Sequence, residues 1–145
     1  MTITPHHLGI CVTDLDRSLR FWCEGLGFET TMVPPVGSEW SDALEIGGEV
    51  EFTAHFITKA GFTFELLHFT TPRPNGEASA TRSQIGFTHL AVDVDDFEGT
   101  IAKLEALGGT LIESTRTTFS LPGATIELAF MADPDGVRIE LVHQY

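Results

Sequence analysis

The chain has 145 residues, of which 42% are hydrophobic, and this is enough to bury the core of a single compact domain over 1–145. Its 21 acidic and 8 basic residues give a net charge of −13, which argues against nucleic acid as a partner, because a phosphate backbone needs a basic face. No apolar run approaches the roughly 18 residues of a membrane span.

The N-terminal segment lacks the basic flank and the apolar stretch of a secretory signal. Cys11 and Cys23 are the only cysteines, and neither belongs to a CxxC or Cys/His metal pattern. We therefore expect a protein of the reducing cytoplasm, although the two positions leave a disulfide between them open.

The first half of the chain predicts one helix among four strands. Alternating apolar residues favour a first strand, and Thr13 with Asp16 is a candidate capping pair for a helix that the glycines at 25 and 27 end. Two prolines close the second strand, and a loop with room for one helical turn fills 34–48. The predicted strands are 7–12, 28–33, 50–58 and 62–69.

The same order of elements restarts after a segment rich in Pro, Thr, Ser and Gly, which is typical of a linker. Asp95 and Glu98 repeat the capping positions of a helix that ends at two glycines, and the DPDG sequence at 133–136 predicts a tight turn. The predicted strands are 87–94, 110–114, 125–131 and 137–143. The chain is thus a duplicated β-α-β-β-β unit, with module 1 at about 5–70, a linker at 71–84 and module 2 at about 85–145.

A histidine opens the repeated segment in both halves. HLGICVTDLDRSL (7–19) and HLAVDVDDFEGTI (89–101) share His, Leu, Val and Asp at matching positions, 82 residues apart. A duplicated strand that carries a histidine can bring His7 and His89 together about a pseudo-twofold axis.

The last strand of each half adds a glutamate among apolar residues, Glu65 in FTFELLHF and Glu140 in VRIELVHQY. Alternation along the strand places each carboxylate opposite the more apolar face, which we expect to pack on the helix. An ionised carboxylate within a strand is costly unless it is paired or binds a cation. Two His and two Glu from four strands suit a divalent transition metal with open positions.

Each of these residues also has a simpler interpretation. A single strand histidine is usually structural or exposed, and a single strand glutamate is usually solvated. The joint pattern at equivalent places in both halves favours the metal site. Alternation assigns His6 to the helix-packing side with Leu8 and Ile10, so His7 is the predicted ligand.

Three further residues are candidate substrate contacts. His55 and Glu127 lie on central strands, where they either line a cavity or are exposed at a sheet edge. Arg138 shares the strand face of Glu140 and is a candidate partner for an anionic substrate, or a solvated rim residue.

The chain resembles the vicinal oxygen chelate superfamily, which includes glyoxalase I, bleomycin resistance proteins and extradiol dioxygenases. The residues that carry the resemblance are HLGICVTDLDRSLRFWCEGLGF (7–28), FELL (64–67), THLAVDVDDFEGTIAKLEALGG (88–109) and DPDGVRIELV (133–142). The resemblance implies an α+β fold of tandem βαβββ modules, with a mixed sheet curled around a metal-binding cup. It also implies a homodimer and metal ligands at His7, Glu65, His89 and Glu140.

A His/Glu/His/Glu ligand set resembles the glyoxalase I type of enzyme. It implies one divalent ion (Ni, Co, Zn, Mn or Fe) and proton abstraction next to a carbonyl of a small-molecule substrate, with Glu140 as the first candidate for the base and Glu65 as the second. Few basic residues are available to hold the carboxylates of glutathione, so we expect a lyase or isomerase whose substrate the sequence does not identify.

Two other functions use the same cup. An Fe(II) extradiol-type ring-cleaving dioxygenase needs two His and one carboxylate, which His7, His89 and Glu140 would supply, with Glu65 as an extra ligand. A non-catalytic small-molecule binding or resistance protein needs no metal, and the intact ligand set argues against it. The sequence leaves open whether the site lies within one chain or is shared between two.

Overall fold

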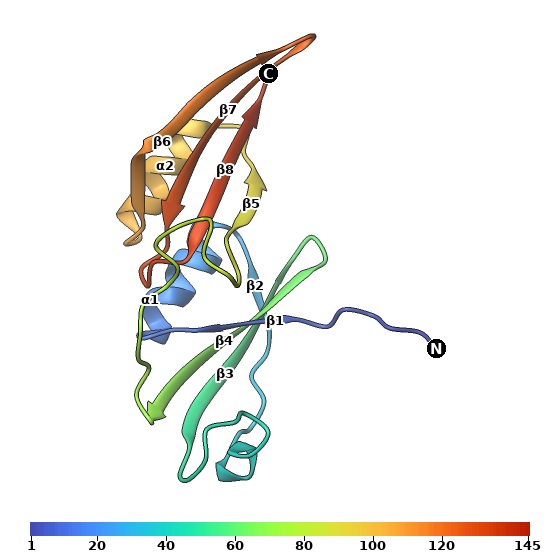
Figure 1. Ribbon diagram of the computed structural model, residues 1–145, viewed down its shortest axis with the longest axis vertical. Helices are drawn as coiled ribbons and strands as arrows, with labels where there is room; N and C mark the ends of the chain where they lie inside the picture. Colours follow the sequence, from blue (N-terminus) through green and yellow to red (C-terminus); the bar gives the residue numbers. More distant parts are fainter. The chain divides into compact units, whose positions relative to one another are not determined.

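The computed structural model describes residues 1–145, and the chain divides into two compact units, Met1–Gly76 and Glu77–Tyr145. Each unit is one β-α-β-β-β module, and their boundary falls within the predicted linker segment 71–84 (Figure 1). The α+β class and the duplicated modules predicted from the sequence are confirmed. No helix has both the length and the apolar character needed to cross a bilayer.

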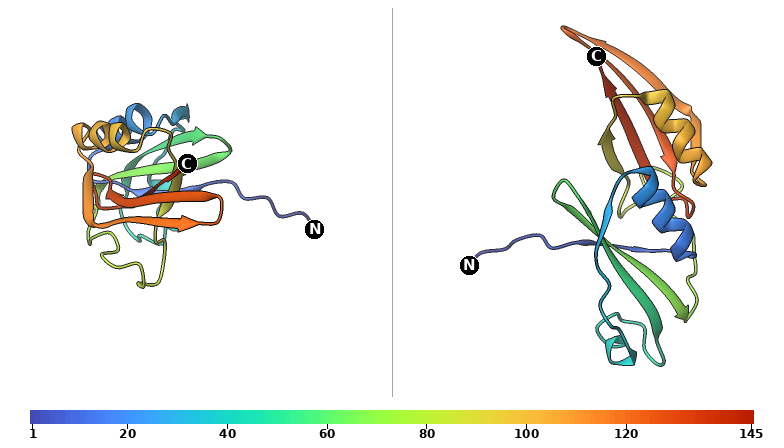
Figure 2. Two further views of the ribbon diagram at one scale, coloured as in Figure 1. Left: turned by 90° about the horizontal axis from the view of Figure 1, so that it is seen from above. Right: turned by 180° about the vertical axis from the view of Figure 1, so that it is seen from behind.

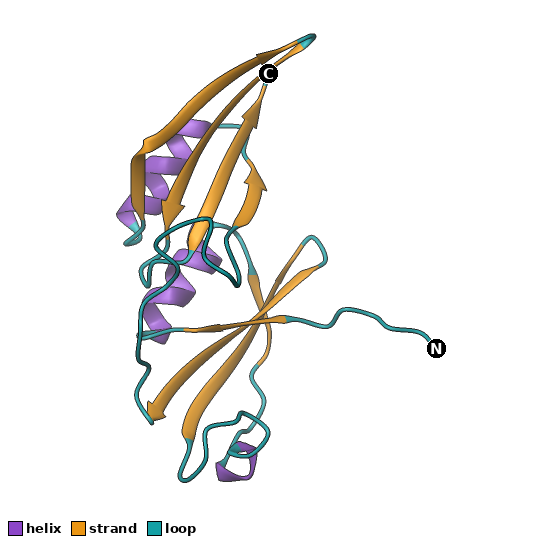
Figure 3. Ribbon diagram, in the orientation of Figure 1, coloured by secondary structure: helices purple, strands orange, loops and turns teal.

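The first unit is a four-stranded mixed sheet with a helix on one face (Figure 3). The strand order is β1-β4-β3-β2, in which β1 and β4 run parallel and the other neighbours are antiparallel. The helix α1 continues directly into a π-helical segment, η1. The elements are β1 (Leu8–Cys11), α1 (Leu15–Leu19), η1 (Arg20–Gly25), β2 (Glu29–Met32), the short 3-10 helix η2 (Ser38–Trp40), β3 (Glu51–Lys59) and β4 (Phe62–Thr71).

The second unit repeats this topology. Its strand order is β5-β8-β7-β6, again with the first and last strands parallel and adjacent. The helix α2 lies against one face of the sheet (Figure 2, right). The elements are β5 (Leu90–Asp93), α2 (Phe97–Ala106), β6 (Thr110–Leu121), β7 (Ala124–Ala132) and β8 (Arg138–Gln144).

The predicted helix caps are wrong by one residue. Asp14 and Asp96 have extended backbones and accept hydrogen bonds from the third residue that follows, so they are the N-caps rather than Thr13 and Asp95. The Thr13 hydroxyl instead accepts a bond of 3.0 Å from the Arg17 guanidinium. Alternation and spacing locate a helix start, but backbone conformation selects the capping residue.

The strand β6 is much longer than the predicted 110–114. It continues to Leu121 and forms a hairpin with β7 around Pro122 and Gly123, with a break in the register between Ile112 and Thr117. Its second half carries Thr and Ser instead of an apolar alternation, so hydrophobic periodicity gives no signal there. Pairing with β7, instead of the burial of an apolar face, stabilises this half of the strand.

The turn predicted at 133–136 is confirmed and is built around a buried carboxylate. The Asp133 side chain accepts hydrogen bonds from the backbone N–H groups of Asp135 (2.9 Å) and Val137 (2.8 Å). Gly136 has a φ of 92°, a conformation that glycine adopts without strain. This turn fixes where β8 begins, and therefore where Arg138 and Glu140 lie.

The core of each unit lies between its helix and its sheet. In the first unit the Trp22 ring contacts Phe28 and Phe64 at centroid distances of 5.6 and 5.1 Å. The predicted division of β4 into faces is confirmed, because Phe64 and Leu66 are buried in this core and Glu65 is not. The core of the second unit comprises Phe97, Ile101, Leu104, Met131, Ile139 and Leu141.

The two tryptophans provide a test of this core. Trp22 is 0% exposed and Trp40 is 46% exposed. We expect Trp22→Ala to lower the free energy of unfolding by about 3–5 kcal/mol, because it leaves a cavity among packed aromatic rings. Trp40→Ala should change it by less than about 0.5 kcal/mol. Urea unfolding followed by far-UV circular dichroism measures both, and equal losses would contradict the described core.

Candidate metal centre

In the first unit the parallel pairing of β1 and β4 brings a histidine to a glutamate. Glu65 pairs with Gly9 across the two strands, and His7 lies two residues before Gly9 on the same face. The His7 Nε2 atom is 3.1 Å from the Glu65 Oε2 atom. The two side chains are 33% and 19% exposed, so the pair is half-buried and still open to a small ligand.

The second unit builds the same pair from equivalent positions. Glu140 pairs with Ala91 across β5 and β8, and His89 lies two residues before Ala91. The His89 Nε2 atom is 3.1 Å from the Glu140 Oε2 atom, and the side chains are 32% and 20% exposed. Equal distances and equal exposure in two sequences that differ at most positions indicate a retained chemical unit.

A phenylalanine, which the sequence analysis missed, completes each pair. Phe56 is the β3 partner of Glu65, and its ring lies edge-on to His7 with centroids 5.1 Å apart. Phe130 is the β7 partner of Glu140, and its ring is 5.2 Å from His89 in the same geometry. Each ring restricts the orientation of the imidazole beside it. Assigning hairpin registers to both halves would have revealed this repeat.

The second ring nitrogen of each histidine has a different partner in the two units. The Nδ1 atom of His89 is 3.0 Å from the hydroxyl of Thr88. The Nδ1 atom of His7 is 2.7 Å from Nδ1 of His6. The placement of His6 on the helix-packing side was wrong: it is exposed, and its ring approaches Phe56 on the Glu65 face. Residue 6 precedes β1, so strand alternation does not govern it.

The donor atoms of each pair fit half of a metal coordination shell. Two ligands at about 2.1 Å from one ion and at right angles to each other are roughly 3 Å apart, which matches the two distances of 3.1 Å. An imidazole nitrogen and a carboxylate oxygen suit a divalent transition metal. The structure brings no three His, Cys, Asp or Glu side chains together in an arrangement that could hold a metal ion, so each unit by itself offers two candidate ligands.

His55 lies on the opposite side of the sheet from the His7–Glu65 pair. It pairs with Leu66, a core residue, and the residues at these positions face the helix. Its Nδ1 atom is buried without a hydrogen-bond partner. The sequence placed it as a substrate contact, but the register directs it away from Glu65, and we leave it out of the site.

Glu127 is likewise directed away from Glu140. It pairs with His143 on the helix-facing side of β7. There the Arg116 guanidinium, which lies over the Phe97 ring, is ion-paired with Glu98 and lies 3.7 Å from the Glu127 carboxylate. The Arg116 hydrogen bond lowers the pKa of the Glu98 carboxyl. Glu127 therefore belongs to a surface ion cluster, and we do not assign it to substrate.

Arg138 keeps the position that the sequence predicted. It opens β8 two residues before Glu140, on the same strand face, and its Nη1 atom donates a hydrogen bond of 2.7 Å to the Gly136 carbonyl. Of the three predicted substrate contacts, it alone shares a face with a glutamate of the His–Glu pairs.

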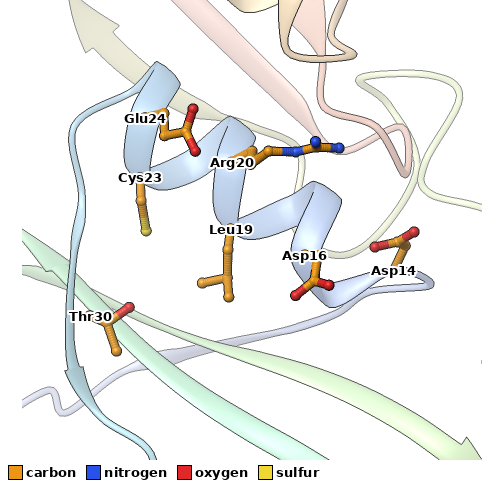
Figure 4. A pocket seen from close by; sticks show the side chains of 7 residues that line it. All are labelled: Asp14, Asp16, Leu19, Arg20, Cys23, Glu24 and Thr30. Atoms are coloured by element: carbon orange, nitrogen blue, oxygen red, sulfur yellow. The ribbon is translucent and has the colours of Figure 1, made fainter.

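A surface cavity of about 650 Å³ in the first unit is lined mainly by residues of α1 and η1 (Figure 4). Its wall includes Cys23 of η1 and Thr30 of β2, and Thr30 pairs with Ile57 on the helix-facing side. Burial raises the pKa of the Cys23 thiol, and the charge of Glu24 adds to this effect, although a hydrogen bond with Thr30 opposes it. A protonated thiol is a poor nucleophile, so the cavity offers no activated group.

Comparison with known proteins identifies the family of the chain. The family model described as the glyoxalase/bleomycin resistance protein/dioxygenase superfamily matches residues 4–141. A protein named probable lactoylglutathione lyase from Synechocystis is 30% identical over 140 residues, with 94% of this chain and 92% of the relative covered. A second protein of that name, from Vibrio parahaemolyticus, is 29% identical and covers 94% and 87%. The uncharacterized YaeR protein of Escherichia coli is 28% identical and covers 96% and 95%.

Solved structures show the same fold. The crystal structure of a glyoxalase family protein from Bacillus cereus aligns with a TM-score of 0.81 at 18% identity, covering 99% of this chain and 95% of the other. A glyoxalase I mutant of Zea mays aligns with a TM-score of 0.64 at 24% identity, covering 94% of this chain and 43% of the other. At these identities the likeness establishes the fold alone.

Thr88 provides a test of how His89 is oriented. We expect Thr88→Val to remove the Nδ1 partner, so that the two neutral tautomers of His89 become more evenly populated. Two-bond proton–nitrogen NMR correlations of the ring read this directly. If His89 ligates a metal ion, the affinity of the T88V protein for that ion should be about 10- to 100-fold lower. Thr81→Val, at an exposed position of the preceding segment, is the control, and an unchanged His89 tautomer in T88V would contradict the assignment.

Proposed function

Because the chain belongs to the glyoxalase/bleomycin resistance protein/dioxygenase superfamily, we propose that it is a divalent-metal-dependent lyase or isomerase of the glyoxalase type. The reaction is the removal of a proton next to a carbonyl group of a small substrate. Several relatives that match nearly the whole chain are named lactoylglutathione lyase, which supports this reaction class.

The observation that carries the proposal is the repeated His–Glu pair. A structural salt bridge needs no repetition, yet both units hold one imidazole and one carboxylate at 3.1 Å, with an aromatic ring in the same place. Two such pairs supply four ligands and leave two positions of an octahedral ion for substrate oxygens. We propose that the two units make one vicinal-oxygen-chelate domain whose pairs share an ion, within one chain or between the chains of a homodimer.

In this proposal His7, Glu65, His89 and Glu140 hold the ion, with Ni, Co, Zn, Mn and Fe all compatible with the ligand set. When bound, such an ion acts as a Lewis acid that polarises a carbonyl and stabilises negative charge developing on its oxygen.

The chain's own carboxylates move the proton. Glu140 is the first candidate for the base and Glu65 the second: the carboxylate takes a proton from the hydroxyl-bearing carbon beside the carbonyl, and the electron pair of the C–H bond moves toward the carbonyl oxygen. The proton then returns to the former carbonyl carbon, while the hydroxyl proton passes to the former carbonyl oxygen, so that the first carbon becomes the new carbonyl. Phe130 packs edge-on to His89 and restrains the ring next to this carboxylate.

Both cysteines are free thiols, which suits a reducing compartment such as the cytoplasm.

Metal content tests the proposal. Tag-free protein purified without chelators should contain one divalent ion for every two His–Glu pairs, measured by elemental analysis. His7→Ala and His89→Ala should each lose it, because each removes one ligand. His68→Ala is the control, since His68 lies on β4 beside Thr53, on the face away from Glu65.

The identity of the ion separates the remaining functions. Nickel, cobalt, zinc or manganese supports the lyase or isomerase. Oxygen-sensitive ferrous iron with ring-cleaving activity would establish the dioxygenase instead. Protein that purifies without metal and binds none on addition would leave the non-catalytic binding function.

The base assignment has a separate test in proton exchange. We expect Glu140→Gln to slow exchange of substrate protons with deuterium by about 10²–10⁴-fold across a panel of hemithioacetals, α-hydroxy-ketones and acyl-CoA esters. Glu65→Gln should slow it less, and Glu127→Gln, on the far face of its sheet, should leave it within about twofold. E140Q protein that keeps both its metal and full exchange would show that Glu140 is not the base.

A further inference from the structure

Two arginines of the second unit lie near residues of the His89–Glu140 pair. Arg138 opens β8 on the face of Glu140, with the two Cα atoms roughly 7 Å apart along the strand. Arg82, from the segment before β5, donates hydrogen bonds to the backbone carbonyls of Ser79 and Thr88. Thr88 in turn contacts the His89 ring, so Arg82 is tied to the residue that orients this histidine.

The turn before β8 places Arg138 near the segment that carries Arg82. A Cβ atom built on Gly136 would lie 3.3 Å from the Ala78 Cβ atom and 4.0 Å from the Arg138 Nη1 atom. The segment that carries Arg82 therefore packs against the turn that carries Arg138. Burial lowers the pKa of Arg82, and the positive charge of Arg138 lowers it further.

No carboxylate neutralises these two cations. The chain has 21 acidic and 8 basic residues, yet neither Arg82 nor Arg138 forms an ion pair with Asp or Glu. Arg116, in contrast, is surrounded by three carboxylates. Like charges repel each other in a half-buried site unless an anion joins them. The hydrogen bonds to backbone carbonyls use only some of the N–H donors of each guanidinium group, so further donors are available to a ligand.

We propose that Arg82 and Arg138 form an oxyanion-binding site that holds a carboxylate or phosphate group of the substrate next to Glu140. This inference rests on the proposed function only where it calls the bound molecule a substrate, because the site itself is defined by the two guanidinium groups. It names a substrate class, a small carbonyl compound with an anionic group a few bonds from the reacting carbon. A strongly acidic protein repels such a molecule, so a local pair of cations is what would attract and orient it.

Binding of simple anions tests the site without a known substrate. Inorganic phosphate and acetate are titrated into wild-type protein labelled with nitrogen-15, and the Nε–H signals of the arginine side chains are followed by NMR. We expect saturable shifts at Arg82 and Arg138 and none at Arg73, an exposed arginine with no ion pair. A preference for phosphate or for acetate indicates which group the substrate carries.

Variants give the energetic test. Arg138→Met should weaken anion binding by about tenfold or more, because a charged hydrogen-bond donor is lost. Arg138→Lys should restore part of it, since an ammonium keeps the charge but not the planar fork. Arg73→Met is the control for the loss of one positive charge. If phosphate and acetate shift no signal, or bind equally well to R138M, the inference is wrong.

The two proposals fail separately. Metal binding without anion binding would overturn the oxyanion site and leave the proposed enzyme. Anion binding that depends on Arg138, in protein that binds no metal, would overturn the enzyme and leave the site. Arg82→Met also removes two bonds to the backbone, so far-UV circular dichroism must show that it is folded before its affinity is interpreted. Wild-type titration needs no such check.

Discussion

Parallel pairing of the first and last strands of each module is the constraint on which the candidate site depends. In such a pair, residues in register lie side by side on one face, so the histidine two positions earlier reaches across to the carboxylate. The residue beside each glutamate is small, Gly9 in one unit and Ala91 in the other. A Cβ atom built on Gly9 would lie 3.5 Å from the Leu67 side chain and in contact with neither member of the pair. Strand register is therefore what brings each histidine to its glutamate.

The two His–Glu pairs are alike in their side chains and different in their surroundings. His7 shares a hydrogen bond with a second, exposed histidine, whereas His89 is held by Thr88, whose backbone is bound by Arg82. The proposed site of Arg82 and Arg138 also belongs to the second unit only. Duplication thus preserved the His–Glu pairs, while divergence gave the second unit two arginines, which in our proposal orient an anionic molecule. That asymmetry suits a substrate with a reactive end and a charged end.

Hydrophobic alternation predicted both sheets because a sheet face that packs on a helix must be apolar at every second residue. It identified the buried face of β4 correctly. It failed at the second half of β6, where threonines and serines pair with β7 without a buried face of their own. It failed again at His6, because the residue precedes the strand. In β6 the conformation is determined by pairing with β7, and at His6 by a segment that lies outside the strand. In neither place does burial of an apolar face determine it.

The sequence by itself determined the duplication and the four residues with ligand chemistry, because a repeated histidine and a glutamate within an apolar strand are visible without any contact information. Only the tertiary structure decided which other residues lie beside these four. It directed His55 and Glu127 to the helix side and placed Phe130 beside His89. It also packed the segment before β5 against the turn before β8, at Ala78 and Gly136. These relations depend on strand register and on the packing of one segment against a distant turn, which local periodicity does not encode.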